Sequence, residues 1–543
     1  MRIFSGSSGW RRHFPAIHFA AGLYFAAALA CVLLMAATSH AQDPAEPPGR
    51  APSPKLLPRP EGRIARSSID ENEMRAIVDE QVACGTRDSY SSWTDAKRGI
   101  GCGRDRIVPR FQAIAKDSGG RMQVIVDKFE TSIPRSSEKL HLENVYAILP
   151  GSDPALAKTV FLVGGDFDSR PSQTEDPNAD APGADDDSSG VAVALEGARL
   201  LSGGTYRATL LFAALSGEEE GLLGAQQLLK YLQANGYTIG GYLNNDIVGA
   251  DSAAGGPHRV RVFSGGGPDG VDSPSRELAR AIEEIDGRDN IRLIFRLDRL
   301  GRGGDHMPFV AAGLPAIRFC EPQENYDHQH QTPRTENGRE FGDFAKFLDF
   351  KFMGNVALDN TEVLRELALA PAPPTQVTMT HQFGTAMGNA EMKWSARVDT
   401  ERAGYEILWR ETTDPRWSVY DYVPEDAAQE AASTVPNNPA YNDATVPGSS
   451  RGQRRAAKET NPSATTNAQA NSQTNVAQAG AGATSGGVSS ATTSTMTRVL
   501  DGVSPDNHFF AVRTVGKNGA RSLAVPAVVP PRPARPPVAR QPQ

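Results

Sequence analysis

Acidic side chains gather in five short clusters along the chain, and the last cluster also contains histidine. Carboxylates that converge in one place repel one another and need cations to neutralise them. Carboxylates joined by an imidazole suit Zn, Mn or Co. One cluster alone has an ordinary explanation, such as a helix N-cap or a solvated loop, but five at equivalent places in successive elements favour a metal site. The clusters are Asp166-Phe-Asp168, Asp185-Asp-Asp187, Glu218-Glu-Glu220, Asn244-Asn-Asp246 and Asp327-His-Gln-His330.

The elements that must position these clusters alternate between short apolar strands and amphipathic helices. Strands that are apolar throughout predict an α/β fold, with a mostly parallel central sheet and helices on both faces. Ligands gather at the carboxyl ends of the strands in such sheets, and the clusters fall there. We assign this unit to residues 67–365. Its expected strands are 122–129, 144–149, 159–164, 209–215, 242–248, 260–263 and 316–320, and its expected helices are 70–82, 104–115, 188–201, 223–232, 273–285 and 341–358.

A second unit follows a Pro-rich hinge at 366–375. Short alternating strands at 391–394, 405–410 and 509–513 predict a small β-sandwich over residues 376–528. Residues from about 424 to 495 are mostly Ala, Thr, Ser, Asn, Gln and Gly, a composition that cannot bury enough apolar surface to fold. We therefore expect a disordered insertion there, and a disordered tail at 529–543.

The first 41 residues have the features of a signal peptide. Arg11 and Arg12 precede an apolar run from 17 to 37, and Ser39-His40-Ala41 offers small residues for cleavage. An uncleaved membrane anchor is the alternative, because the run approaches the roughly 20 residues that span a bilayer. We expect a linker at 42–66, export to the periplasm or the medium, and no stable membrane insertion after cleavage. The net charge of −8 and the lack of a basic block argue against nucleic-acid binding.

Two of the four cysteines flank a short polar segment. Export would permit a disulfide between Cys84 and Cys102. Two free buried thiols are the alternative, and we favour the bridge. Cys31 lies in the apolar N-terminal run, and Cys320 lies in an apolar strand, where we expect an inert core residue.

Several motifs between residues 70 and 360 together resemble a known family. They are GGDFDSR, APGADDDSSGVAV, SGEEEGLLG, YLNNDIVG, GGDHMPF, GLPAIRF and YDHQHQ. This set resembles the co-catalytic zinc exopeptidases of the bacterial leucyl aminopeptidase and aminopeptidase Y type. Glutaminyl cyclase and glutamate carboxypeptidase II share that fold. The runs YEILWR and FFAVRTVG in the second unit resemble a fibronectin type III domain.

The resemblance implies two divalent metal ions, zinc with Mn or Co as alternatives, and peptides as substrates. Asp186 matches the carboxylate that bridges both metals, and Glu218 matches the general base. Glu219 matches a ligand to the first metal, which a histidine of the YDHQHQ segment completes. We choose His330 and keep His328 as the alternative, because the spacing does not separate them.

The second metal would be held by Asp186, Asp166 and Asp246. Here the chain departs from the family, which usually has a histidine where this chain has Asp166, oriented by the residue that matches Asp168. Asp can ligate zinc, so we retain Asp166 as a ligand. With Glu219, four carboxylates would then balance two divalent ions to zero, a change that shifts preference toward Mn or Co and lowers the pKa of bound water less. A weak or vacant second site is the alternative, and Asp168 loses its imidazole partner.

A further pair, Asp305 and His306, matches an Asp-His pair near the family's pocket, although a helix N-cap explains it equally well. Taken together, the resemblance implies a metallo-aminopeptidase that removes N-terminal residues with a metal-activated water and Glu218 as base. The alternatives are a single-metal relative such as a glutaminyl cyclase, a carboxypeptidase, or a non-catalytic protein whose sandwich binds a surface or polymer. The retained Glu218 argues against the last of these.

Overall fold

The structure is a computed structural model that describes residues 58–133, 139–174, 176–251, 258–265, 272–382, 389–426, 493–501, 503 and 508–530. The expected signal peptide (1–41) lies outside the described residues, as do residues 42–57 of the linker, 427–492 of the insertion and 531–543 of the expected tail (529–543). Within the described part of the chain, no helix combines the length and the apolar character that a membrane crossing requires.

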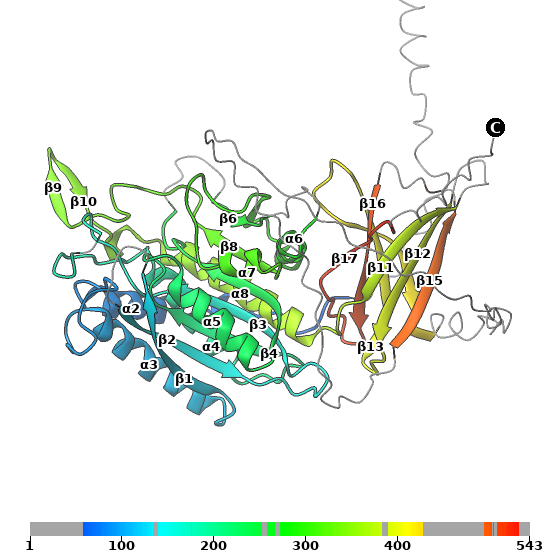
Figure 1. The fold of residues 1–543 in the computed structure, drawn as a ribbon, viewed down its shortest axis with the longest axis horizontal. Helices are drawn as coiled ribbons and strands as arrows, with labels where there is room; N and C mark the ends of the chain where they lie inside the picture. The colour runs from blue at the N-terminus through cyan, green and yellow to red at the C-terminus, as the bar shows by residue number, and fades with distance from the viewer. Residues whose placement is uncertain are drawn as a thin grey trace, which may run out of the picture.

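The larger part of the molecule is an eight-stranded mixed sheet in the order β1-β2-β4-β3-β5-β8-β6-β7 (Figure 1). Strands β4, β3, β5 and β8 at its centre are parallel, whereas the β1–β2, β2–β4 and β6–β8 pairs are antiparallel. The mostly parallel sheet predicted from the sequence is therefore found in the centre, which is the part that carries the acidic clusters. The strands are β1 (Gln123–Ser132), β2 (Lys139–Leu149), β3 (Thr159–Asp166), β4 (Thr209–Leu215), β5 (Thr238–Asn245), β6 (Val260–Phe263), β7 (Ile291–Ile294) and β8 (Ala316–Cys320).

Helices cover both faces of this sheet because the central strands are apolar on both sides. Along β3, Phe161 and Val163 pack into one core, and Val160 and Leu162 pack into the other. The first core contains α2, α3, α4, α6 and α8, and the second contains α5 and α7. The helices are η1 (Arg66–Ser68), α2 (Glu71–Val82), α3 (Ile100–Asp117), α4 (Ser188–Leu201), α5 (Leu223–Ala234), α6 (Pro274–Asp286), α7 (Met307–Ala311), η2 (Ala345–Phe347) and α8 (Phe350–Leu369).

The last helix of the α/β part differs from the sequence prediction. The prediction placed it at 341–358, but α8 begins after Asp349, whose side chain accepts the N–H groups of Lys351 and Phe352 as an N-cap. The preceding residues instead form the small hairpin of β9 (Arg334–Glu336) and β10 (Arg339–Phe341) and the short η2. The helix continues to Leu369, past the expected domain end at 365, because no proline occurs between its start and Pro371.

The C-terminal part packs a three-stranded sheet (β11-β12-β15) against a four-stranded sheet (β14-β13-β16-β17). Both sheets are antiparallel and share one core, in which Trp394, Tyr405 and Phe510 are buried. A β-sandwich is therefore present, as the alternating pattern predicted. Its strands are β11 (Thr375–Gln382), β12 (Asn389–Arg397), β13 (Arg402–Glu411), β14 (Ser418–Pro424), β15 (Thr493–Asp501), β16 (His508–Gly516) and β17 (Val525–Pro526).

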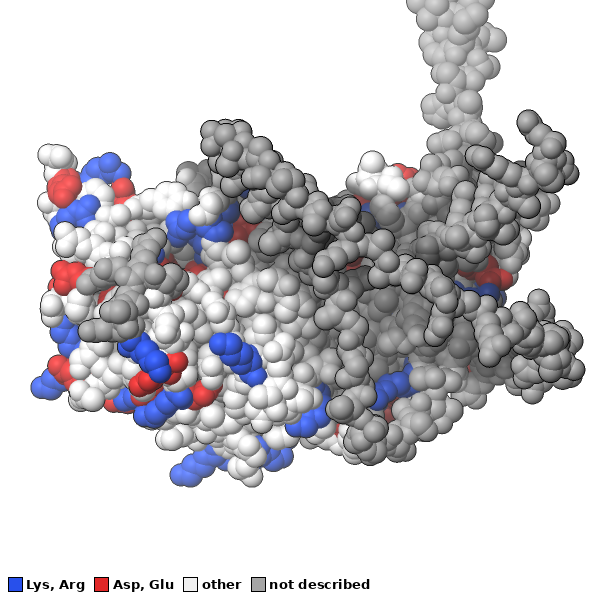
Figure 2. Space-filling model, in the orientation of Figure 1, with Lys and Arg blue, Asp and Glu red and all other residues white. Residues whose placement is uncertain are grey.

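Two further features concern the cysteines and the surface. Cys84 and Cys102 form a disulfide with Cα atoms 5.8 Å apart, which confirms the predicted bridge, and Cys320 is a buried free thiol. Figure 2 shows basic and acidic side chains interspersed over the described surface of the α/β part on the face in view.

Candidate metal centre

The acidic clusters meet where three parallel strands end. Asp166 is the last residue of β3, the Gly217–Glu219 turn follows β4, and Asp246 follows β5. Because these strands are parallel neighbours, their carboxyl ends lie at one edge of the sheet. The triple-Asp cluster reaches the same place from the loop before α4.

The sequence allowed two roles for the triple-Asp cluster, a helix N-cap and a metal ligand. Asp187 takes the first role and Asp186 is placed for the second. Asp187 is the N-cap of α4 and accepts the N–H of Gly190 at 2.8 Å. Its carboxylate also accepts the N–H groups of Asp166 at 3.2 Å and Ile247 at 3.3 Å, so it joins the end of β3 to the residues that follow β5. The side chain of Asp186 is thereby free to face the cleft.

Asp186, Glu219 and His330 form a three-residue group whose candidate ligand atoms all lie within 4.8 Å of one another. The Nε2 atom of His330 is 2.9 Å from Asp186 Oδ2 and 2.8 Å from Glu219 Oε1. Burial disfavours a charge on this imidazole, but the two carboxylates outweigh burial and raise the pKa of His330 to about 10. The group therefore attracts a positive charge to its centre.

This donor set fits a zinc ion. Carboxylate oxygen and imidazole nitrogen are both zinc ligands, and a catalytic zinc takes three protein ligands, which leaves a further position for water or substrate. Gln329 donates to Asp186 Oδ2 at 3.1 Å, and Arg170 lies 3.3 Å from Glu219 Oε2, so each carboxylate is also held from outside the group.

Glu218 lies beside this group in a cleft of about 400 Å³ that Asp186, Glu219 and His330 also line. Burial and then the neighbouring Asp246 raise the pKa of Glu218 well above its usual value. Glu218 is therefore placed to exchange a proton with a molecule in the cleft.

Asp168 fixes the turn that carries Glu218 and Glu219. Its carboxylate accepts the backbone N–H groups of Gly217 at 2.7 Å, Glu218 at 3.2 Å and Glu219 at 3.3 Å, and the hydroxyl of Ser89 at 2.9 Å. The sequence left the role of Asp168 open because no imidazole precedes it. The structure gives it a different task, which is to set the direction of the turn.

Arg87 lies in the segment between α2 and α3 and forms hydrogen bonds to two loops of the site. Its fully buried guanidinium donates to the carbonyls of Phe167 at 2.7 Å, Pro182 at 2.6 Å and Gly183 at 2.8 Å. Burial lowers the pKa of Arg87 to about 10, and the surrounding carboxylates oppose that effect. One side chain thus joins the loop after β3 to the loop before α4.

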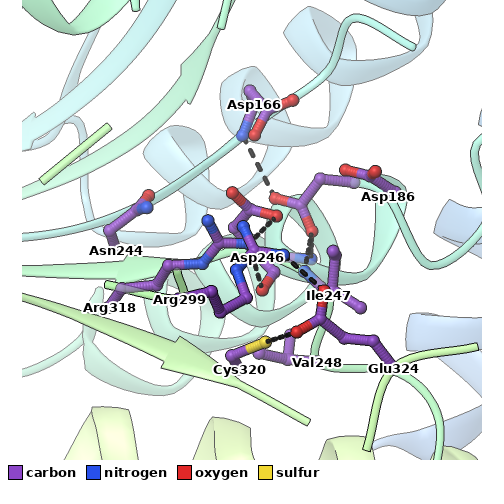
Figure 3. A network of polar contacts seen from close by, with 12 residues as sticks. Asp166, Asp186, Asn244, Asp246, Ile247, Val248, Arg299, Arg318, Cys320 and Glu324 are labelled. Carbon is purple, nitrogen blue, oxygen red and sulfur yellow. Dashed lines mark hydrogen bonds and ion pairs between the residues drawn. The ribbon is translucent and has the colours of Figure 1, made fainter. Parts of the chain in front are cut away.

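Two residues predicted for the second ion, Asp166 and Asp246, are outside this three-residue group. Asp246 Oδ1 lies 2.7 Å from Nη2 of Arg318, a fully buried residue of β8 (Figure 3). Asp166 is buried and its Oδ1 atom has no hydrogen-bond partner. Across the residues that the structure describes, neither Asp166 nor Asp246 belongs to a three-residue group that could hold a metal.

Three other predicted residues, His328, Asp305 and His306, are outside the three-residue group. His328 is outside the three-residue group, and its ring stacks on Phe347 with centroids 3.7 Å apart. His306 is the N-cap residue of α7 without a side-chain capping bond, and its Nε2 atom lies 2.8 Å from the carbonyl of Leu297. Asp305 is fully buried, and neither of its carboxylate oxygens has a hydrogen-bond partner in the described structure.

Comparison with known proteins decides the family. A model of peptidase family M28 matches residues 144–347. A probable zinc metalloprotease of Leptosphaeria maculans is 38% identical over 389 residues, which cover 67% of this chain and 89% of the relative. The chain belongs to peptidase family M28. A probable zinc metalloprotease of Pyricularia oryzae is 37% identical over 435 residues, 75% of this chain and 86% of the relative. The LapA aminopeptidase of Legionella pneumophila gives a TM-score of 0.42 at 18% identity, over 56% of this chain and 73% of that one.

As a member of M28, this chain is a metal-dependent peptidase. Sequence reasoning missed three residues of its site: Arg87, Arg318 and Gln329. Arg318 interrupts an apolar strand in the motif GLPAIRF, and a charge in a buried strand needs a buried partner. That signal was present in the sequence, but nothing in the spacing identifies Asp246 as the partner.

Proposed function

We propose that this M28 peptidase is a zinc aminopeptidase that removes N-terminal residues from peptides. The observation that carries the proposal is the group of Asp186, Glu219 and His330 with Glu218 beside it in one cleft. Zinc is supported by this donor set and by the relatives described as probable zinc metalloproteases.

The chemistry follows from the placement of Glu218. A zinc ion in this site would polarise the substrate carbonyl and acidify water. Glu218 takes a proton from the attacking water and passes it to the leaving amine. The carboxyl groups of Asp186, Glu218 and Glu219 line the cleft, which supports binding of the free α-ammonium group of a substrate.

A carboxypeptidase is the second candidate, because arginines also line the cleft. Arg170, Arg299 and Arg302 could bind a C-terminal carboxylate. However, Arg170 is paired with Glu219, and Arg299 is paired with Asp298 and Glu324. Two of the three arginines are therefore already neutralised, and we favour the aminopeptidase.

A peptide ladder read by mass spectrometry tests the proposal. The substrate is one peptide in three forms: free at both ends, N-acetylated, and C-terminally amidated. We expect single residues to leave from the N-terminus of the free and amidated forms, and no cleavage of the acetylated form. Loss from the C-terminus would show the carboxypeptidase. A loss of ammonia from an N-terminal glutaminyl peptide, without hydrolysis, would show a cyclase.

Glu218→Gln is the matched test of the base. The change keeps the shape of the side chain and removes its capacity to hold a proton. We expect kcat to fall by about 10²- to 10⁴-fold, with zinc content by elemental analysis unchanged. Wild-type turnover in the zinc-loaded variant would refute the assigned role.

We also propose that the chain is exported, to the periplasm or the medium, and that the sandwich is a fibronectin type III-like domain that docks a surface or polymer. The disulfide between Cys84 and Cys102 supports export, because disulfides persist in oxidising compartments. The division of the sandwich into sheets of three and four strands supports the domain type.

A further inference from the structure

We infer that the guanidinium of Arg318 takes the place of the second divalent ion, so that the working enzyme holds one metal, on Asp186, Glu219 and His330. The inference rests on the proposed zinc-peptidase function and specifies the metal content of its site. It replaces the two-metal centre that the sequence resemblance implied.

The position of Arg318 in the sheet brings its charge to Asp246. Arg318 is the middle residue of β8, which pairs with β5 so that Arg318 lies opposite Asn244, two residues before Asp246. Its Nη2 atom lies 2.7 Å from Asp246 Oδ1 and 3.4 Å from the Asp246 carbonyl oxygen. A permanently charged group is thus bonded to the carboxylate that would have ligated the second ion.

Contacts on the opposite side hold the guanidinium in place. Its Nη1 atom donates to the carbonyl of Gly303 and lies 3.5 Å from Asp298 Oδ2. Gly304 packs so closely that a Cβ atom there would lie 2.9 Å from Nη1. Arg318 is fully buried, so its side chain has no room to swing aside and admit an ion.

The second ion would therefore meet a fixed cation. An ion ligated by Asp246 would lie within a few ångströms of the guanidinium, where two positive charges repel strongly in a buried site. Asp166 keeps a buried Oδ1 atom without a hydrogen-bond partner, but with Asp246 bonded to Arg318 only Asp166 and Asp186 remain of the predicted set, fewer than the three protein ligands of a catalytic zinc. Arg318 already neutralises Asp246, which removes the electrostatic reason for a second ion.

Metal content tests this inference without any need for turnover. The full mature chain is loaded with excess Zn²⁺, passed through a desalting column and measured by elemental analysis. We expect one zinc per chain, and two would overturn the inference. Loading with Mn²⁺ gives an independent readout by electron paramagnetic resonance. An isolated six-line spectrum supports one ion, and an exchange-coupled multiline spectrum refutes it.

Variants assign the effect to Arg318. Arg318→Met removes the charge and should admit a second zinc, whereas Arg261→Met, a control on β6 that removes an arginine paired with Glu324 at 2.8 Å, should keep one. A folded Arg318→Met with one zinc would refute the role of Arg318. Should Arg318→Met fail to fold, Asp246→Asn serves instead. It keeps one zinc if Asp246 binds Arg318, and it drops from two to one if Asp246 binds metal.

The outcomes separate this inference from the proposed function. One zinc per chain without cleavage of any peptide would leave the inference standing and remove the aminopeptidase. Two zinc ions per chain with N-terminal cleavage would do the reverse.

Discussion

At the scale of residues, the site depends on side chains outside the three-residue metal group. Asp168 receives three backbone N–H groups from the turn that carries both the base and a metal ligand. Hydrogen bonds to a charged acceptor contribute about 1.5–3 kcal/mol each. The turn is therefore fixed by one carboxylate, in place of the imidazole contact that the resemblance implied.

Asp168→Asn should lower kcat by about 10- to 100-fold, because one carboxylate oxygen becomes an NH₂ group that faces backbone donors. Asp168 positions Glu218 and the metal ligand Glu219 on the same turn, so zinc affinity should fall together with kcat, whereas KM should change little. Steady-state kinetics and elemental analysis measure the two effects. Ser89→Ala, which removes only the hydroxyl donor, is the control and should retain most activity. A normal kcat in Asp168→Asn would show that the turn keeps its conformation without this carboxylate.

The two histidines of the YDHQHQ segment should behave differently. His330→Ala removes an atom within 3 Å of both carboxylates and should leave the desalted protein without zinc. His328→Ala removes a ring stacked on Phe347 and should retain zinc. Competition with a chromophoric chelator compares the two affinities. Equal zinc affinity in both variants would contradict the assignment of His330.

The pattern placed the cluster of Glu218 and Glu219 at a strand end and the cluster of Asp186 before a helix, and the resemblance singled out these three residues. The spacing did not separate His330 from His328, since both lie in a loop without periodicity. The contact between Arg318 and Asp246 could not be predicted from the sequence, for another reason. Their side chains meet only after β5 and β8 pair, and that register is set by the whole sheet.

At the scale of elements, the segment between α2 and α3 acts as a brace for the metal site. It begins at Cys84, ends in α3 with Cys102, and carries Arg87 between them. The helices on either side were predictable from their apolar periodicity. The direction of the outer strands was not, because β2 pairs antiparallel to β4 through contacts that local sequence does not encode.

Cys84→Ala/Cys102→Ala should destabilise the protein by about 3 kcal/mol, because the bridge closes a loop with a sequence separation of 18. Activity should fall as well, since Arg87 would no longer be held against the two metal loops. Urea denaturation and peptide turnover measure these effects. Cys320→Ala alters a thiol outside the brace and is the matched control for cysteine removal. Unchanged activity in the double variant would show that the position of Arg87 does not depend on the disulfide.

At the scale of the whole molecule, the sandwich is docked on the α/β part through α6. Trp417 donates to Glu277 at 2.7 Å, and several arginines of the sandwich pair with acids on or just before this helix. These pairs are Arg410–Asp272, Arg416–Glu283 and Arg513–Glu284. The number of directed contacts argues for a fixed orientation of the two parts (Figure 1).

This contact should make stability depend on pH. Burial raises the pKa of Glu277 to about 7, although Arg280 opposes the rise, against 4.5 for an exposed glutamate. Glu277 holds its proton more tightly in the folded protein than in the unfolded chain. Its contribution to the free energy of unfolding is therefore complete below pH 4.5 and is lost as the pH rises through 7. The loss is on the order of 3 kcal/mol.

Glu277→Gln should remove this dependence while keeping an acceptor for Trp417. Urea denaturation at pH 5.5, 7 and 8.5 measures it, and the difference between wild type and variant isolates this group from other titrating residues. The free energy of unfolding of the variant should increase relative to that of the wild type as the pH rises. A constant difference across this range would contradict a protonated Glu277.

The bridge between Cys84 and Cys102 also links catalysis to redox potential. A cytosol rich in glutathione and thioredoxin keeps thiols reduced, so enzyme made there would hold its zinc ligands while Arg87 is less firmly placed. Two preparations with identical sequence and identical metal would then differ in specific activity according to the compartment that produced them. In glutathione buffers of graded redox potential, the specific activity of this peptidase would rise in one step, centred on the midpoint potential of this disulfide.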